Sequence, residues 1–300
     1  MVSPSRITQV NRHYGIPCDS QALLDQGALW LFVASRCTRP LVHPVFLTYK
    51  ICRKIIYYFR EIQGREEMSN WLKLRYTIYN STRCAGFLSD NELEIDVDAY
   101  DLQSKHYGLF VEEADEQKLI GGLRIIQNAP VLSSIRTLKE LGLLEYCQQQ
   151  KAGEVLPILS YFPEDKDDYF DPLMPQGRIA TEGSRLVLNK EYQSLRLAKF
   201  IISNAIILHL EMEDDWVAFV SCNPLHARLY QSFGFENVCD HKTWAKDAPV
   251  SALYLRDHKL SIDKRPELEQ MLHDYRRDGY TQYQHVRKAA AAPAPLRRTA

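Results

Sequence analysis

Residues 180–188, Ala-Thr-Glu-Gly-Ser-Arg-Leu-Val-Leu, place two opposite charges at the start of an otherwise apolar strand candidate. Side chains alternate between the two faces of a strand, so we expect Glu182 and Ser184 on one face and Arg185 on the other, unless a bulge turns it. Charges buried in a sheet are costly unless they are paired or used in chemistry. A long apolar helix candidate follows at residues 192–210, as in sheets that are covered by helices.

The same alternation of segment types continues along the chain. Hydrophobic periodicity predicts further strands and helices, namely strands at residues 105–111, 119–126, 216–222 and 250–256, and helices at residues 66–80, 134–151 and 224–232. Residues 161–178 are rich in Pro, Asp and Tyr and are expected to be irregular. This order predicts an α/β (α+β) domain around a central sheet.

We expect residues 66–256 to form this domain, preceded by a helical, basic extension at residues 1–65. Residues 1–62 hold eight Lys and Arg against three Asp and Glu. A basic amphipathic helix is predicted at residues 46–62, which either lies on an anionic membrane surface or packs on the domain with its charges in water. A helical segment is expected at 257–287 and a disordered tail at 288–300.

The composition excludes several function classes. The chain of 300 residues is 45% hydrophobic and has a net charge of −1, so it has no overall field for nucleic acid. Its seven cysteines are scattered without metal-ligand spacing, which predicts reduced thiols and no metal site. We find no signal-peptide pattern, and the longest apolar run near the start, residues 28–34, is shorter than the ~20 residues that span a bilayer. We therefore expect a cytoplasmic protein, at most peripheral at the inner membrane.

Residues 223–235 carry the spacing Asn-x6-Tyr-x3-Gly-Phe directly after a strand candidate. This resembles the closing motif of the GNAT superfamily of acyltransferases. The resemblance implies a central mixed, twisted sheet with splayed strands flanked by helices. It also implies that Asn223 lies beside the pantetheine arm of an acyl thioester and that Tyr230 protonates the leaving thiolate. The alternative for Tyr230 is plain packing under the sheet.

At the expected binding site for the acyl donor, this sequence departs from the usual motif of that superfamily. Gln193-Ser-Leu-Arg196-Leu-Ala198 stands where the family carries Gln/Arg-x-x-Gly-x-Gly/Ala, whose backbone N–H groups hold the pyrophosphate of coenzyme A. Arg196 in place of the Gly would crowd a pyrophosphate, which favours acyl carrier protein over acyl-coenzyme A as donor. Lys190, Gln193 and Arg196 are then expected at the phosphopantetheine, where the basic residues would attract an acidic carrier protein. A solvated basic helix face is the alternative. The thioester is a co-substrate, and no tightly bound cofactor is expected.

Further motifs, from residue 75 to residue 185, indicate which families of the superfamily the chain resembles. It carries, in order, Arg75-x3-Tyr79, Phe87, Asp98-x-x-Asp101, Gly121-Gly-Leu-Arg124 and Glu182-x-Ser-Arg185. Over about residues 70–235 this resembles the bacterial acyl-homoserine lactone (autoinducer) synthases and the related long-chain N-acyl amino acid synthases. Phe87 stands where autoinducer synthases keep Trp, and Tyr79 where they keep Phe. These departures favour the amino acid-acylating branch.

The charges of these motifs suit an amine acceptor that carries a carboxylate. An Arg grips a carboxylate bidentately, and acids can surround an ammonium group. The residues expected at the acceptor are Arg75, Asp98, Asp101, Arg124 and Arg185. Glu182, directly or through a water, is the predicted general base, with Ser184 beside it, and backbone N–H groups of a splayed strand would stabilise the oxyanion. The alternative for the ions is a structural network that holds the acidic loop to the sheet.

Together these features predict an N-acyltransferase that moves a long-chain fatty acyl group from acyl carrier protein or acyl-coenzyme A to an amino acid-type amine. Three alternatives remain open on the sequence. They are an autoinducer synthase using S-adenosylmethionine, an acyltransferase of exosortase systems, and a non-catalytic binding module on the same fold.

Overall fold

The computed structural model describes residues 53–82, 84–88, 92–113, 116–150, 153–174, 179–212, 215–239, 243–245 and 248–287. The described residues all belong to one compact unit, Lys50–Ala300. The predictions for residues 1–52 and for a disordered tail at 288–300 lie outside the described residues. Among the described helices, none combines the length and apolar character needed to cross a bilayer.

A mixed sheet forms the centre of this unit. Eight strands follow one another in the order β6-β8-β5-β4-β3-β2-β1-β9, and β7 pairs with β8 beside this path. The β4–β5 pair is parallel, whereas the other pairs are antiparallel. The strands are β1 (Arg53–Glu61), β2 (Ser104–Glu113), β3 (Glu116–Gln127), β4 (Ile179–Leu188), β5 (Trp216–Cys222), β6 (Glu236–Asn237), β7 (Thr243–Ala245), β8 (Ala248–Leu255) and β9 (Tyr280–Arg287). The predicted α/β class with a central mixed sheet is confirmed.

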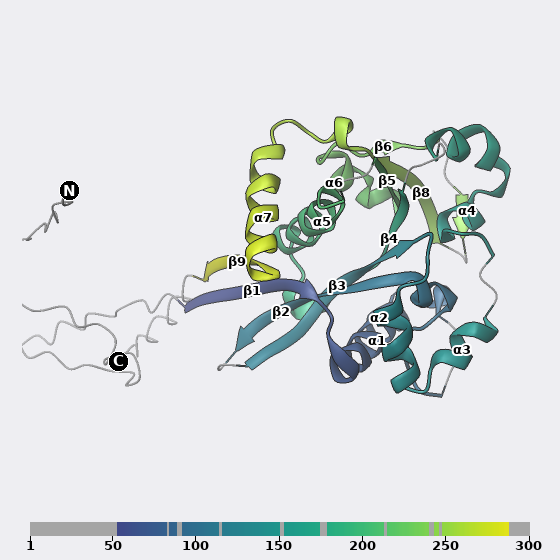
Figure 1. Cartoon of the computed structure of the whole chain (residues 1–300). Helices are drawn as coiled ribbons and strands as arrows, with labels where there is room; N and C mark the ends of the chain where they lie inside the picture. The colour runs from purple at the N-terminus through teal and green to yellow at the C-terminus, as the bar shows by residue number, and fades with distance from the viewer. Residues whose placement is uncertain are drawn as a thin grey trace, which may run out of the picture. The chain divides into compact units, whose positions relative to one another are not determined.

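Helices cover both faces of the sheet (Figure 1). They are α1 (Gly64–Asn80), α2 (Leu132–Glu140), α3 (Leu144–Gln149), α4 (Pro157–Tyr161), α5 (Leu195–Leu210), α6 (Ala227–Gln231) and α7 (Arg265–Asp278). Phe110 of β2 belongs to the same buried cluster as Trp71 of α1, whereas its neighbour Leu109 belongs to the cluster that contains Phe200 of α5. Strand side chains alternate between faces, so these two clusters mark the two sides of the sheet.

One predicted helix is interrupted. Residues 134–151 form α2 and α3 in place of one helix, because Gly142 takes a positive φ of 73° between them. Residues 163–173 form short 3₁₀ and π turns, in keeping with the irregular segment expected there.

The predicted helix at 46–62 is wrong over its described part. Residues 53–61 form β1, a strand between β2 and β9. The run Ile-Ile-Tyr-Tyr-Phe at 55–59 is β-branched and aromatic, and burial of Tyr57 and Phe59 follows the two-residue period of a strand. The segment 257–287 is helical over α7, but it ends in β9, which pairs with β1. One sheet therefore crosses both predicted boundaries, at residues 65 and 256.

Candidate functional site

A bulge in β4 re-aims Arg185. The register between β3 and β4 shifts between Gly122 and Arg124, and Arg185 has a φ of 55°. A non-glycine residue in the left-handed region of a strand marks a bulge, which turns its side chain out of the regular alternation. Arg185 consequently contacts the carbonyl of Phe87 at 3.2 Å, and Phe87 packs edge-on against Tyr161 of α4. Strand alternation alone predicted Arg185 on the face opposite Glu182, and the bulge is the exception to that expectation that the sequence left open.

Just before this bulge, β4 and β5 part. Their parallel pairing runs from Ile179 with Trp216 to Gly183 with Val220 and goes no further. Beyond that point β4 stays with β3, to Leu188, and β5 stays with β8. The opening between the strands is called the β4–β5 gap here. A narrow cavity of about 30 Å³ lies along it, and Ser184 and Tyr230 are among its lining residues.

The carboxylates of the site come from the segment before β2. Asp98 caps the 3₁₀ turn Ala99–Gln103, accepting from the N–H of Tyr100 at 2.9 Å. Asp101 reciprocates by accepting from the N–H of Asp98 at 2.8 Å. This capping box explains locally why the two acids stand three residues apart. Asp96, two residues before the cap, is buried as well.

Three guanidinium groups converge on these carboxylates. Arg75 of α1 donates to Asp96 and Asp101, both at 2.8 Å. Arg124 of β3 donates to Asp98 and Asp101 at 2.7 Å each. Arg185 donates to Asp96 at 2.7 Å and reaches Asp98 at 3.4 Å. Helix, loop and two strands are thus tied together by one ionic cluster, named here the Arg–Asp cluster.

Charge in the Arg–Asp cluster is balanced, with three arginines against three aspartates. Burial acts against the charged carboxylates, but the arginines outweigh it. Arg124 and Arg75 hold the pKa of Asp101 well below its usual value, and the pKa of Asp96 and of Asp98 is lowered in the same way. Arg75 and Arg124 are at most 1% exposed, so solvent reaches this cluster chiefly at Asp98, whose side chain is 19% exposed.

Glu182 lies near this cluster without an ion pair to any described residue. It is fully buried, and it accepts hydrogen bonds from the N–H of Ile158 at 2.8 Å and from the hydroxyl of Ser221 at 2.9 Å. Burial raises its pKa to about 7, although these two donors, and Arg124 and Arg185 more weakly, act in the opposite direction. A carboxyl group in this state can exchange a proton near neutral pH.

Tyr230 lies on α6, the helix that follows β5. Its ring packs edge-on against Phe235 with 5.5 Å between centroids, and it lines the same cavity as Ser184. Burial raises the pKa of its hydroxyl above the ordinary value, so the phenol stays protonated at neutral pH. Ser184 and Tyr230 therefore share the cavity along the gap, whereas Glu182, which pairs with Phe219 one residue before the strands separate, is not among its lining residues.

The residues predicted to bind the donor lie apart from the Arg–Asp cluster. Lys190, Gln193 and Arg196 are exposed in the turn after β4 and in the first turn of α5, where Ser194 caps the helix. Gln193 donates to the carbonyl of Leu188 at 3.3 Å. Asn223 is exposed and caps the turn that follows β5, accepting from the N–H of Leu225 at 3.0 Å.

Three residues of the site escaped the sequence reasoning. The alternation Glu-Ile-Asp-Val-Asp at 94–98 would have marked Asp96, since its acids repeat with the period of an extended segment. Ser221 and Tyr161 carried no such signal. Tyr161 lies in α4, half-buried beside Glu182, and the pKa of its hydroxyl is raised by burial first and by Glu182 second.

His106, which lies beside Asp101 of the Arg–Asp cluster, has a structural role. Trp71 donates from Nε1 to Nδ1 of His106 at 3.1 Å, so the ring proton belongs on Nε2, which lies 3.7 Å from Asp101. Burial lowers the pKa of His106 to about 4, which leaves the ring neutral at physiological pH. It therefore supports the cluster without adding charge.

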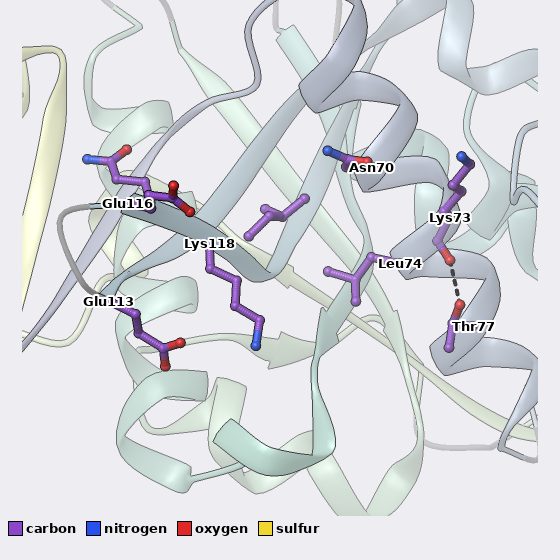
Figure 2. Close-up of a pocket in the computed structure, with 9 residues that line it drawn as sticks. Asn70, Lys73, Leu74, Thr77, Glu113, Glu116 and Lys118 are labelled. Carbon is purple, nitrogen blue, oxygen red and sulfur yellow. Dashed lines mark hydrogen bonds between the residues drawn. The ribbon is translucent and has the colours of Figure 1, made fainter.

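A larger cavity lies away from this chemistry. It measures about 540 Å³ and is open between α1 and the β2–β3 hairpin, as Figure 2 shows. Its lining is mostly exposed and polar, and it includes Lys73, Glu113 and Lys118 but none of the predicted site residues. Among the described residues, no group of three or more His, Cys, Asp or Glu side chains is arranged to hold a metal ion.

Comparison with known proteins gives matches to solved structures alone. No protein-family model matches the chain, and no curated protein matches it. The similar structures include FeeM, an N-acyl amino acid synthase from uncultured soil microbes, at 19% identity and a TM-score of 0.45, covering 68% of this chain and 91% of that one. The acyl-homoserine lactone synthase LasI matches at 16% identity and a TM-score of 0.44, over 68% of this chain and 90% of that one.

A third match is BjaI, a CoA-dependent acyl-homoserine lactone synthase, at 13% identity and a TM-score of 0.45. It covers 72% of this chain and 90% of that chain. These proteins are of the two kinds that the sequence motifs resemble. The activity proposed below rests on the residues of this chain.

Proposed function

We propose that this protein is an N-acyltransferase that moves a fatty acyl group from a thioester to the amine of an amino acid-type acceptor. The observation that carries the proposal is Glu182, a buried carboxyl group without a cationic partner among the described residues, at the point where β4 and β5 separate. A pKa of about 7 suits it to take a proton from an ammonium group at physiological pH.

The proposed reaction needs one base, one acid and an oxyanion site. Glu182, directly or through a water beside Ser184, takes a proton from the acceptor ammonium. The free amine attacks the thioester carbon, and backbone N–H groups along the gap stabilise the oxyanion. As the C–S bond breaks, the nitrogen gives its second proton to water, and Tyr230 protonates the leaving thiolate and regains a proton from water. Glu182 then releases the first proton to solvent, so that each turnover yields one net proton. The products are an amide and a free thiol.

The Arg–Asp cluster supports the proposal as a rigid wall of the acceptor site. Arg75 and Arg124 both bind Asp101 in the interior, so the part of these three residues is to fix the geometry. Asp98 and Arg185 are the members with exposed side-chain atoms. We assign Asp98 to the acceptor ammonium and Arg185 to its carboxylate.

The donor is proposed to be acyl carrier protein, with acyl-coenzyme A as the second choice. Lys190 and Arg196 are exposed on the side of the gap where β4 runs into α5, and Gln193 lies between them. Cations at that place suit a single phosphate and an acidic protein surface. We place the pantetheine arm beside Asn223 and Tyr230. A cytoplasmic location, where acyl carrier protein is found, belongs to the same proposal.

Turnover by the purified protein tests the function. The protein is incubated with long-chain acyl carrier protein or acyl-coenzyme A and a mixture of amino acids, and products are identified by mass spectrometry. We expect an N-acyl amino acid, and at least a 100-fold loss of turnover in Glu182→Gln, in line with the ~10²–10⁴ attributed to general-base catalysis. Release of methylthioadenosine from added S-adenosylmethionine would identify an autoinducer synthase instead. No transfer to any amine would refute the proposal.

A further inference from the structure

Glu182 depends on two donors for its stability as an anion. Its side chain is fully buried, and one carboxylate oxygen accepts from Ile158 while the other accepts from Ser221. Both oxygens are thereby fixed, and the carboxyl group has one orientation. The charged groups that face Glu182 are Arg124 of β3 and Arg185 of β4, with the neutral Tyr161 on α4. Both arginines already bind aspartates, so they do not replace the two donors.

The first donor is the backbone N–H of Ile158, in the first turn of α4. α4 begins at Pro157, which has no N–H, and the N–H of Ile158 has no partner within the helix. Glu182 accepts that N–H from a neighbouring strand and so takes the place of a capping residue. This hydrogen bond belongs to the backbone and is the same whatever side chain residue 158 carries.

The second donor is a side chain at the opening of the gap. Glu182 pairs with Phe219 in the parallel ladder, and Ser221 lies two residues further along β5 on the same face. Val220 makes the last pair with β4, so Ser221 is the first residue of β5 beyond the separation. Its backbone pairs with Ala252 of β8, which leaves its hydroxyl free to reach back to Glu182.

We propose that Ser221 is a positioning residue, whose hydroxyl holds the Glu182 carboxylate ionised and in a single orientation beside the β4–β5 gap. The proposal rests on the proposed function, in which Glu182 is the base. It goes further by assigning the control of that base to β5, a strand on which no catalytic residue was predicted. Loss of the hydroxyl leaves the buried anion with one donor, so protonated Glu182 becomes more favourable and the base works only at higher pH.

A direct titration tests the hydrogen bond without using activity. Carboxyl carbons are labelled with ¹³C in all glutamates, and the Glu182 signal is identified by its absence in Glu182→Gln. We expect the titration midpoint of Glu182 to rise by about one pH unit in Ser221→Ala, the shift that corresponds to one hydrogen bond to a charged group. Ser133→Ala, which removes an exposed hydroxyl on α2, should leave the midpoint unchanged. An unchanged midpoint in folded Ser221→Ala overturns the proposal.

A second pair of variants covers the case in which Ser221→Ala does not fold. Ser221→Thr and Ser221→Val have nearly the same shape, both suit a strand, and they differ in the hydroxyl. We expect Thr to keep the wild-type midpoint and Val to raise it. Equal midpoints in the two variants also overturn the proposal.

The pH profile of acyl transfer links the hydrogen bond to catalysis. The acid limb of kcat/KM should move upward in Ser221→Ala by the shift found in the titration, and Ser221→Thr should restore it. A midpoint that moves while the acid limb does not would exclude Ser221 from the control of the base. Absence of acyl transfer in the wild-type protein would refute the proposed function, whereas the titration would still decide whether Ser221 sets the protonation of Glu182.

Discussion

At the scale of single residues, Glu182 links the pH dependence of folding to that of the proposed catalysis. Its pKa is about 7 in the folded protein against an ordinary 4.5, so the unfolded chain loses this proton first. The stability associated with the protonated form is fully present below pH 4.5 and is lost as pH rises through 7. The difference amounts to about 3 kcal/mol. We therefore expect Glu182→Gln to be more stable than the wild type at pH 8 and similar to it at pH 4.5.

Urea unfolding at several pH values measures this difference. Other titrating groups contribute to both proteins alike, so the quantity of interest is the free energy of unfolding of the variant minus that of the wild type. It should grow between pH 4.5 and 8. A constant difference across this range would mean that Glu182 ionises in the fold as readily as in the unfolded chain.

Asp101 is a buried carboxyl group of the opposite kind to Glu182, because arginines hold it in the charged form. Asp101→Asn keeps the shape but leaves Arg75 and Arg124 with less negative charge in the interior. Breaking one side of a buried ion pair costs about 3–5 kcal/mol, and we expect a destabilisation of that order at pH 7. Lys259→Ala removes an exposed ion pair with Glu236 and should cost less than about 1 kcal/mol. Equal effects in the two variants, measured by chemical unfolding, would contradict a supporting role for the cluster.

At the scale of elements, the bulge in β4 depends on a glycine of the neighbouring strand. Gly122 has a φ of 154°, and a Cβ there would lie 2.1 Å from the carbonyl oxygen of Tyr107. We expect Gly122→Ala to destabilise the protein by more than about 3 kcal/mol, because backbone must move on both sides. Gly142→Ala is the matched control, since its φ of 73° is also strained for Ala but nothing lies within 4 Å of the new Cβ. It should cost about 1 kcal/mol.

Thermal unfolding of the two glycine variants separates the cost of a positive φ at alanine from the cost of the clash that its Cβ makes with β2. Both carry the cost of a positive φ, and Gly122→Ala alone adds the clash with β2. A loss of stability in Gly122→Ala no greater than that in Gly142→Ala would show that β2 and β3 adjust without cost, and that the bulge does not need this residue.

The elements differ in how far the sequence determines them. The strand at 180–188 was predictable, and so was the need to pair its charges, because a charge buried in an apolar strand is costly. The bulge that turns Arg185 was left open, since strand alternation alone places this side chain on the opposite face. β1 was not, because its Lys and Arg residues imitate a helical period while its partners, β2 and β9, come from distant parts of the chain. The Arg–Asp motifs located the cluster, but its internal charge balance depended on Asp96. Ser221 could not be found, since a lone serine in an apolar strand has no pattern.

At the scale of the whole molecule, the two ends of the described chain complete one sheet. β9 covers the outer edge of β1, and α7 packs beside α5 on one face (Figure 1). The contact extends into the core, because Thr281 donates to buried Asn204 of α5. Tyr283 also packs with Phe200 and with Tyr57, at centroid distances of 5.6 and 6.0 Å. The last strand is therefore a structural part of the acyltransferase unit proposed here.

Truncation tests this dependence. Ending the chain at Asp278 removes β9, leaves Asn204 without its hydroxyl partner and exposes the edge of β1 along eight residues of pairing, from Arg53 to Arg60. We expect a lower unfolding temperature and self-association on size-exclusion chromatography, because an unpaired strand edge binds other edges. Ending the chain at Arg287 keeps all of β9 and is the control. If both truncated proteins were monomeric and equally stable, β9 would be dispensable, and the sheet would be complete at β1.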